Sequence, residues 1–239
     1  MNRVKAIAKP IVKRIKSFNL KEFLTPKAYK ILLLGDSITT TEGRTNWPTY
    51  AAPILKAQML NFARAGASIT DWEAPEHPRQ KLSKQVTDAI AEGVKPDAVV
   101  VAICTNDVWR EDLLGDVETA LSKDLDNLDR RFVLEALVWN LKTINKHFPE
   151  ATCFFGLPTQ RADRTPEEMA WLTDPVQEIA KHFGFVLLDA THESGIAVDR
   201  RKEKVHHPGK YTTDGLHLNR LGQRLLGNYY GNKLKSFLA

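Results

Sequence analysis

Short apolar runs alternate with longer amphipathic stretches along most of the chain. Residues 31–34 are four apolar residues in a row, followed by a glycine. This run is too short for a helix and is typical of a fully buried strand. Four further runs have strand character, although the second of them is weak. The five predicted strands cover residues 30–35, 58–63, 97–104, 151–157 and 185–189.

Helical periodicity fills the intervals between the predicted strands. Strands that alternate with helices favour a parallel sheet covered by helices on both faces, because each connection between parallel strands must cross the sheet. We therefore expect a three-layer α/β/α fold with no internal repeat. The predicted helices cover about 47–58, 78–92, 116–147, 166–183 and 218–238.

The chain has a formal net charge of +5, but this charge is unevenly distributed. Residues 1–30 contain nine Lys or Arg and one acid, which gives this segment a net charge of +8. The remainder of the chain therefore carries −3. Because the basic charge belongs to the N-terminal segment, we expect no nucleic-acid partner for the globular part.

The N-terminal segment, residues 1–29, has the pattern of a basic amphipathic helix interrupted near Pro10. It has no uninterrupted apolar core and no small-residue cleavage site, so it is a poor secretory signal. No stretch of the chain approaches the roughly 18–20 apolar residues of a membrane-spanning helix. We expect a cytoplasmic or peripheral protein with an N-terminal extension, followed by one domain from 30 to 239. The extension would contact a membrane surface or a larger assembly, act as an organelle presequence, or cover an apolar patch of its own domain.

Candidate catalytic residues lie at the two ends of the domain. Asp36 and Ser37 follow the first predicted strand, and ligands of open α/β sheets bind outside the carboxyl ends of the strands. A serine nucleophile needs a base and a group that orients this base. Asp214 and His217 are three residues apart, so in a helical turn the carboxylate reaches the imidazole and stabilises its charged form. Together these residues predict acyl transfer by Ser37, His217 and Asp214.

Acyl transfer also requires hydrogen-bond donors aimed at the developing oxyanion. Three candidates follow consecutive predicted strands, namely the Ser37 backbone N–H, Gly66 and the Asn106 side chain. Each of them alone is more often a turn residue. Their recurrence at successive strand ends favours one shared site.

Two long connections, residues 64–77 and 190–213, also leave the carboxyl ends of strands and should border this site. The second is rich in basic residues, which would suit an acidic polysaccharide, but Asp199 and Glu203 interrupt the basic cluster and favour a solvated loop. Several residues near strand ends are candidate substrate contacts, and the tryptophans among them would either stack on sugar rings or pack in the core. These candidates are Asp36, Trp47, Trp72, Asp107 and Trp109.

The chain contains two cysteines, Cys104 and Cys153, and both lie in apolar runs. We predict buried free thiols rather than a disulfide or a metal cluster. The adjacent His206 and His207 are poor metal ligands, because neighbouring side chains seldom converge on one ion. There is no phosphate-binding Gly-Lys-Ser/Thr loop and no Gly-x-Ser-x-Gly motif. We therefore expect neither a cofactor nor a metal.

Four sequence blocks resemble those of the SGNH hydrolases of the GDSL esterase/lipase superfamily. They contain Ser37, Gly66, Asn106 and His217, the last in an Asp-x-x-His pair with Asp214, and the resemblance covers about 30–225. It implies a flavodoxin-like sheet of order 2-1-3-4-5, Ser37 as nucleophile, His217 as general base and Asp214 as its orienting group. The oxyanion hole would comprise the Ser37 and Gly66 amides and the Asn106 side chain.

The chain departs from the family pattern at Cys104, where the third block usually has a glycine. A side chain there is expected to narrow the acyl site or to shift the Asn106 loop. The first block, Gly-Asp-Ser-Ile-Thr, is similar to that of bacterial carbohydrate acetylesterases. The resemblance thus implies a serine esterase that removes a small acyl group, best predicted as O-acetyl, from a carbohydrate. Alternatives are a short-chain lipid esterase, a sugar O-acyltransferase, or a catalytically weakened carbohydrate-binding module of the same fold. The oligomeric state is not indicated.

Overall fold

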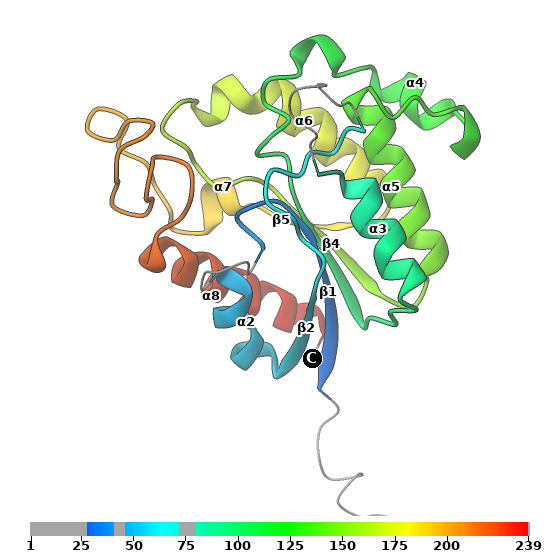
Figure 1. Cartoon of the computed structure of the whole chain (residues 1–239), viewed down its shortest axis with the longest axis horizontal. Coiled ribbons are helices and arrows are strands. Elements are labelled where there is room, and N and C mark those ends of the chain that lie inside the picture. The colour runs from blue at the N-terminus through cyan, green and yellow to red at the C-terminus, as the bar shows by residue number, and fades with distance from the viewer. Residues whose placement is uncertain (1–27, 41–45, 72–79, 239) are drawn as a thin grey trace, which may run out of the picture.

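The protein forms a five-stranded parallel sheet of order β2-β1-β3-β4-β5 (Figure 1). The computed structural model describes residues 28–40, 46–71 and 80–238. Fold class and strand order are as predicted, and each strand lies within two or three residues of its predicted bounds. The strands are β1 (Tyr29–Gly35), β2 (Ala57–Asn61), β3 (Ala98–Ala102), β4 (Thr152–Gly156) and β5 (Val186–Leu188).

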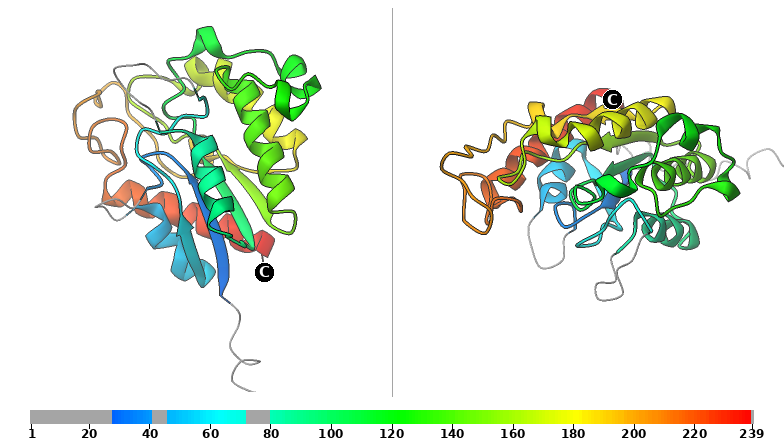
Figure 2. Two further views of the ribbon diagram at one scale, coloured as in Figure 1. Left: turned by 45° about the vertical axis from the view of Figure 1, so that its right-hand side comes forward. Right: turned by 90° about the horizontal axis from the view of Figure 1, so that it is seen from above.

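Helices cover both faces of the sheet (Figure 2). Four of them pack on one face, namely α3 (Leu82–Ala91), α4 (Val117–Ser122), α5 (Val133–His147) and α6 (Pro166–His182). The other face is covered by α2 (Trp47–Leu55) and α8 (Arg220–Leu238). One short helix, α7 (Ala190–Glu193), and two 3-10 helices at Glu111–Leu113 and Leu125–Asn127 lie in the connections.

The side chains of β1 explain why its sequence is continuously apolar. Leu32 and Leu34 point into the core under α3, α5 and α6, whereas Ile31 and Leu33 point into the core under α2 and α8. All four are completely buried. Full burial of such a side chain stabilises the fold by about 1.5–3 kcal/mol. The part of this central strand with both faces covered, from Ile31 to Leu34, therefore has no polar position.

Helix α8 returns the end of the chain to the beginning of the sheet. Its glycines allow close packing on α2, because a Cβ at Gly227 would lie 2.6 Å from the Cβ of Tyr50. Trp47 and Tyr230 pack edge to face across this contact, with ring centroids 4.8 Å apart. The Tyr29 hydroxyl donates a hydrogen bond to the Leu238 carbonyl. These contacts fix the helix that follows the predicted His217 site.

The prediction of one continuous helix over 116–147 is wrong, because the structure has two helices there, α4 and α5, with a connection between them that is not α-helical. The chain leaves α4 at Lys123 and folds back over the first turn of α5, instead of continuing as one helix. The carboxylate of Glu135, which is buried, accepts hydrogen bonds from the Asp129 backbone N–H and the Lys123 ammonium group, both at 2.7 Å. Burial of this carboxylate therefore requires the chain reversal, which periodicity alone does not show.

The predicted N-terminal extension lies almost entirely outside the described residues. Its last residue, Tyr29, already belongs to β1. In the part of the chain that the structure describes, none of the helices combines the length and the apolar character needed to cross a membrane.

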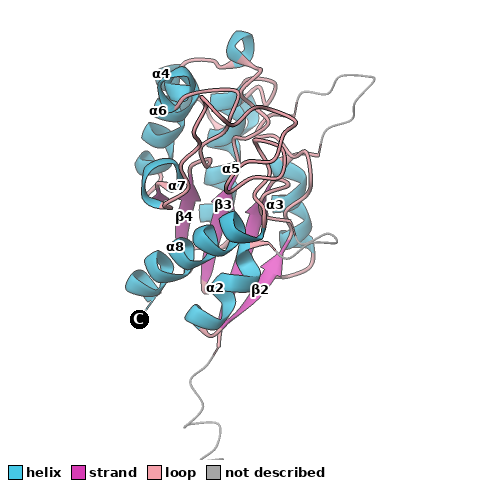
Figure 3. Cartoon of the chain, turned by 90° about the vertical axis from the view of Figure 1, so that its left-hand side faces the viewer, coloured by secondary structure: helices cyan, strands magenta, loops and turns pink. Residues whose placement is uncertain are grey.

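The loops that leave the carboxyl ends of the strands gather at one end of the molecule (Figure 3). The backbone N–H of Arg64, beyond β2, donates to the Gly35 carbonyl, and Asn106, beyond β3, contacts the Ala67 carbonyl. Sheet order thus brings the loops after β1, β2 and β3 together. The site residues lie on these loops.

Candidate active site

Ser37, His217 and Asp214 form a continuous chain of contacts. Ser37 Oγ lies 3.0 Å from His217 Nε2, and His217 Nδ1 lies 2.7 Å from Asp214 Oδ2. The first pair is separated by 180 residues in the sequence. All three are only partly buried, so a substrate can reach them. In this arrangement the imidazole can take the serine proton while the carboxylate stabilises the resulting positive charge.

Asp214 and His217 lie in a loop rather than in the predicted helical turn. Asp214 Oδ1 accepts hydrogen bonds from the backbone N–H groups of Leu216, at 3.0 Å, and of His217, at 2.7 Å. The Thr213 N–H donates to the His217 carbonyl at 2.7 Å and closes the loop, and α8 begins only at Arg220. The three-residue spacing therefore brings the Asp214 carboxylate to the His217 ring through a turn centred on Asp214, and not because the two residues share a helix face.

The electrostatic setting keeps Asp214 ionised. Partial burial tends to raise its pKa, but hydrogen bonds from the His217 ring and from the backbone N–H groups of His217 and Leu216 outweigh this effect. The net result is a pKa below the ordinary value of an aspartate. The carboxylate is thus charged at neutral pH, as its orienting role requires.

A buried side chain that the sequence analysis missed holds the turn before the candidate nucleophile. Gln85 of α3 accepts a hydrogen bond from the Gly35 N–H and donates one to the Gly35 carbonyl, both at 2.8 Å. Gly35 has no room for a side chain, because a Cβ would overlap the Ala102 carbonyl. The signal was present in the sequence, since Gln85 is a polar residue on the apolar face that Leu82 and Val86 define.

Asp36 shapes the backbone around Ser37. Its side chain is 1% exposed, and Oδ1 accepts a hydrogen bond from the Ile38 N–H at 3.0 Å. Burial raises its pKa, while hydrogen bonds from Ile38 and Thr105 and the nearby His217 act in the opposite direction. The expectation of a substrate contact is wrong for Asp36, because its carboxylate lies beneath the turn.

The expected oxyanion donors lie on adjoining loops. Gly66 has a φ of 74°, in the left-handed region that favours glycine. The Asn106 side-chain amide donates one hydrogen bond to the Ala67 carbonyl at 2.8 Å. This bond fixes the orientation of the Asn106 amide next to Gly66.

Cys104 occupies a backbone conformation made for glycine. Its φ is 100°, a region that L side chains rarely adopt, and its side chain is completely buried in the core cluster. The thiol packs into the core, so it does not narrow the acyl site as expected. The cysteine instead strains the backbone at its own position. Burial raises the thiol pKa well above its ordinary value, with a contribution from Asp107 and Asp36. Cys104 therefore packs in the core and does not act as a nucleophile.

Cys153 is also a buried free thiol, and burial raises its pKa to about 12. The prediction of two buried free cysteines is confirmed. Within the described ranges, no three His, Cys, Asp or Glu side chains lie together as metal ligands would.

Two further predicted substrate contacts are core residues. Trp47 is completely buried, and its indole N–H donates to Thr39 Oγ1 at 3.2 Å. Asp107 is also completely buried, and both of its carboxylate oxygens accept the Ile69 N–H, at 3.0 and 3.1 Å. These predictions are wrong, because neither side chain has surface to offer a ligand. Asp107 instead ties the loop after β3 to the loop after β2.

The remaining two tryptophans differ. Trp109 is 58% exposed, and the guanidinium carbon of Arg164 lies 4.3 Å from the centre of its ring. Trp109 stays a candidate contact, three residues beyond Asn106. The candidate Trp72 lies outside the described residues.

The loop between β4 and α6 connects the two halves of the site, which the sequence analysis did not anticipate. Arg161 is 4% exposed, binds Asp163 through two hydrogen bonds and donates a third to the Thr105 carbonyl at 2.8 Å. The adjacent Ala162 N–H donates to the Gly215 carbonyl at 2.8 Å. This loop therefore contacts both the Asn106 loop and the Asp214 turn.

Solved structures support the fold. A protein from Lactobacillus plantarum superposes with a TM-score of 0.65 and 18% identity over 87% of this chain and 98% of that chain. The aryl esterase of M. smegmatis gives a TM-score of 0.58 and 17% identity over 87% of this chain and 99% of its own. Est24, a carbohydrate acetylesterase from Sinorhizobium meliloti, gives 0.58 and 16% over the same shares of the two chains. No curated protein sequence matched the chain.

The family follows from the sequence itself. The family model that describes the GDSL-like lipase/acylhydrolase family matches residues 33–225, a span that runs from inside β1 into α8. This span includes Ser37, Gly66, Asn106, Asp214 and His217. The chain belongs to the GDSL-like lipase/acylhydrolase family.

Proposed function

We propose that this protein is a serine esterase that removes a small acyl group, an O-acetyl group, from a carbohydrate through an acyl-enzyme. The observation that carries the proposal is the chain of contacts from Ser37 Oγ through His217 to Asp214. A hydroxyl, an imidazole and an ionised carboxylate in this order constitute the machinery of nucleophilic acyl transfer.

In the proposed mechanism, His217 Nε2 accepts the Ser37 proton as Oγ attacks the ester carbonyl. Asp214 stabilises the imidazolium that forms. The alcohol leaves with the proton from His217, and a water molecule, activated by the same imidazole, then releases the acyl group as a carboxylic acid. Proton transfer of this kind contributes a rate factor of about 10²–10⁴.

The oxyanion of the tetrahedral intermediate would be held by the Ser37 and Gly66 backbone N–H groups and by the Asn106 side-chain amide. Each such donor lowers the barrier by roughly 3–4 kcal/mol. Asn106 is oriented in advance by its bond to Ala67, so little reorganisation is needed when charge develops.

Three observations favour a carbohydrate ester. The Gly-Asp-Ser-Ile-Thr block is similar to that of carbohydrate acetylesterases, and one structural neighbour is a carbohydrate acetylesterase. Trp109, three residues beyond Asn106, is 58% exposed, although the guanidinium group of Arg164 lies over its ring. A short-chain lipid ester and acyl transfer to a second sugar are the alternatives within the same chemistry.

A catalytically weakened carbohydrate-binding protein is the second candidate function. Cys104 favours it, because a strained residue two positions before Asn106 is a departure from the glycine of the family. The complete contact chain of Ser37, His217 and Asp214 favours the esterase, since a binding module has no use for it.

The test compares hydrolysis of p-nitrophenyl acetate by the wild type, by Ser37→Ala and by a variant that begins at Ala28. We expect turnover in the wild type and in the shortened variant, and background rates in Ser37→Ala. A serine-reactive fluorophosphonate should label the wild type at Ser37. Background hydrolysis together with no labelling would reject the esterase and favour the binding module.

We also propose that the N-terminal extension contacts a membrane surface or an assembly. Sedimentation with anionic vesicles, with and without residues 1–27, tests the membrane contact, and equal sedimentation of the two forms would reject it.

A further inference from the structure

A second Asp–His pair lies at the end of β5. Asp189 follows this strand, and His192 Nδ1 lies 2.9 Å from Asp189 Oδ2. The other carboxylate oxygen accepts the His192 backbone N–H at 3.2 Å. This is the bonding pattern of Asp214 and His217, but no serine or cysteine lines the adjoining cavity. The pair therefore presents an oriented imidazole without a nucleophile.

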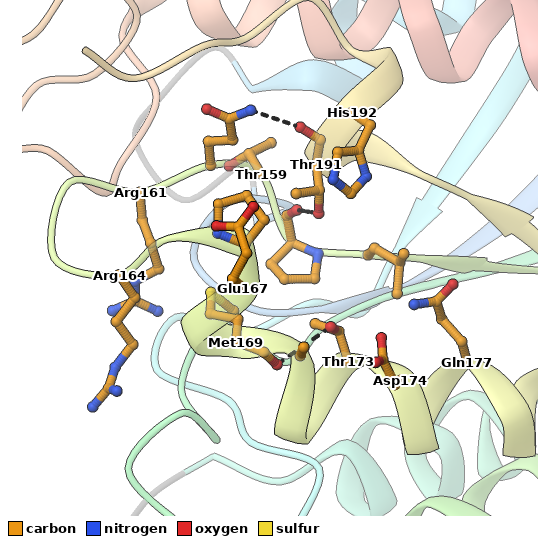
Figure 4. A pocket seen from close by; sticks show the side chains of 15 residues that line it. Thr159, Arg161, Arg164, Glu167, Met169, Thr173, Asp174, Gln177, Thr191 and His192 are labelled. Atoms are coloured by element: carbon orange, nitrogen blue, oxygen red, sulfur yellow. Dashed lines mark hydrogen bonds between the residues drawn. The ribbon is translucent and has the colours of Figure 1, made fainter. Parts of the chain in front are cut away.

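His192 borders a cavity of about 220 Å³ between the β4–α6 loop, α6 and α7 (Figure 4). The cavity lies beside a loop of the candidate active site, because Arg161, which lines it, donates a hydrogen bond to the Thr105 carbonyl next to Asn106. The β4–α6 loop is the one that contacts the Asn106 loop and the Asp214 turn. A ligand that extends from Ser37 along this loop would reach the cavity.

Helix α6 contributes one wall of the cavity. Glu167, Ala170, Asp174 and Gln177 recur at spacings of three and four, so they share a helix face. Figure 4 shows Asp174 and Gln177 on this wall and His192 on α7. Among the residues that the structure describes, the side chains of Asp174 and Gln177 form no hydrogen bond or ion pair with a protein group, so their polar atoms are available to a ligand.

The chemistry of the lining selects among ligand classes. Ten of the fifteen lining residues are polar, so the cavity offers hydrogen-bonding groups beside its apolar surface. Two arginines also line the cavity, but Arg161 is paired with Asp163 and the guanidinium group of Arg164 lies over the Trp109 ring. The carboxylates of Glu167 and Asp174 therefore disfavour an anion. A carboxylate, an amide and an imidazole together accept and donate the hydrogen bonds that neighbouring hydroxyl groups require. The small side chain of Ala170 leaves space between them.

We propose that this cavity is a subsite for a neutral sugar residue, bound through Asp174, Gln177 and the His192–Asp189 pair. Its link to catalysis rests on the proposed function: the sugar in the cavity belongs to the carbohydrate whose acyl group reaches Ser37. The substrate class is then an acylated oligosaccharide or polysaccharide, rather than a single acylated sugar. The three side chains determine specificity and take no part in the acyl-transfer chemistry.

The first test measures sugar binding without catalysis. Ser37→Ala is titrated in a calorimeter with cellobiose, xylobiose, maltose, lactose, mannobiose and chitobiose. We expect at least one of these to bind with a Kd of about 1 mM or lower. Adding Asp174→Ala with Gln177→Ala, or His192→Gln, should weaken this binding at least about ten-fold. Glu178→Ala is the matched control, because this exposed carboxylate lies on the same helix but does not line the cavity.

Two outcomes of this titration would overturn the subsite. One is that none of the six disaccharides binds with a Kd below about 10 mM. The other is that binding survives in the cavity variants, or falls equally in Glu178→Ala.

The second test separates the subsite from the esterase. It compares kcat/KM for the acetylated form of the bound disaccharide with kcat/KM for p-nitrophenyl acetate, which has no sugar. The ratio of these two values should fall about ten-fold in Asp174→Ala and should keep its wild-type value in Glu178→Ala. An unchanged ratio in Asp174→Ala would overturn the subsite while leaving the esterase intact. Cavity-dependent sugar binding by a protein that hydrolyses no ester would reject the esterase and retain the subsite.

Discussion

Gln85 and Gly35 form a reciprocal pair in which one side-chain amide satisfies both backbone groups of one residue. The two hydrogen bonds are each 2.8 Å long, and Gln85 is completely buried. Gly35 is the last residue of β1, two positions before Ser37. The pair therefore links the packing of α3 to the position of the candidate nucleophile, although the two residues are 50 positions apart.

Replacing Gln85 with methionine tests this link. The methionine retains the length of the side chain but leaves the Gly35 N–H and carbonyl buried without partners, which should cost about 2–4 kcal/mol of unfolding free energy. Urea unfolding measures this loss, and kcat for p-nitrophenyl acetate should fall because Ser37 loses its support. Lys84→Ala, on the exposed side of the same helix, should change stability by less than about 1 kcal/mol. An unchanged unfolding midpoint in Gln85→Met would contradict the pairing.

Cys104 provides a test of backbone strain. At an ordinary position, replacing alanine with glycine lowers stability by about 0.5–1 kcal/mol. At a φ of 100° we expect the reverse, with Cys104→Gly more stable than Cys104→Ala by about 1 kcal/mol. The comparison of the two variants removes the effect of the lost thiol, since both lack it. If urea unfolding shows the alanine variant to be the more stable, Cys104 is not strained.

Asn106 is expected to act mainly after the substrate has bound. Asn106→Ala should lower kcat for p-nitrophenyl acetate by a factor of about 10²–10³ and change KM little, because the lost bond forms with the oxyanion. The substitution also removes the bond to the Ala67 carbonyl, so circular dichroism must show a native fold. A rise in KM with an unchanged kcat would place Asn106 in substrate binding instead.

The sequence predicted the five strands well, because buried parallel strands such as β1 and β3 are continuous apolar runs, whereas the strand order came from the resemblance to the SGNH hydrolases. It also predicted that Ser37, Asp214 and His217 would meet, because their spacing relative to the strands places them at one edge. The sequence analysis was wrong where a residue with a polar group near a strand end is buried in the interior. Trp47 and Asp107 follow or precede strands just as binding residues do, and only three-dimensional packing shows them buried.

The residues that the sequence analysis missed are those whose partners are distant. Arg161 and Gln85 are polar side chains that form hydrogen bonds with backbone groups far away in the sequence. No local pattern identifies such a partner. The second Asp–His pair was visible as Asp189-x-x-His192, but its significance depends on the cavity that α6 and α7 form together.

Asp36 gives the clearest prediction of pH dependence. Because burial raises its pKa, the folded protein holds this proton more tightly than the unfolded chain does. The stability that this group contributes is therefore fully present below the unfolded pKa of about 3.9 and is lost as the pH rises through the raised folded pKa. Asp36→Asn keeps an oxygen for the Ile38 N–H and cannot ionise. Its Tm should exceed that of the wild type at pH 7 by about 2–4 °C, and the difference should shrink toward pH 4.

Asp88→Asn is the control for this experiment, because the side-chain hydrogen bond from Lys84 holds the pKa of Asp88 below its ordinary value. The pH dependence of stability then has the opposite sign. The wild type should lose its stability advantage over Asp88→Asn as the pH falls below about 4. Asp36→Asn should also lower kcat about ten-fold, because the Asp36 charge and the His217 imidazolium attract each other. A variant that is both more stable and slower would show that this buried charge is retained for catalysis at the expense of stability. Parallel Tm curves for Asp36→Asn and the wild type at every pH would show instead that Asp36 has the same pKa in the folded and unfolded states.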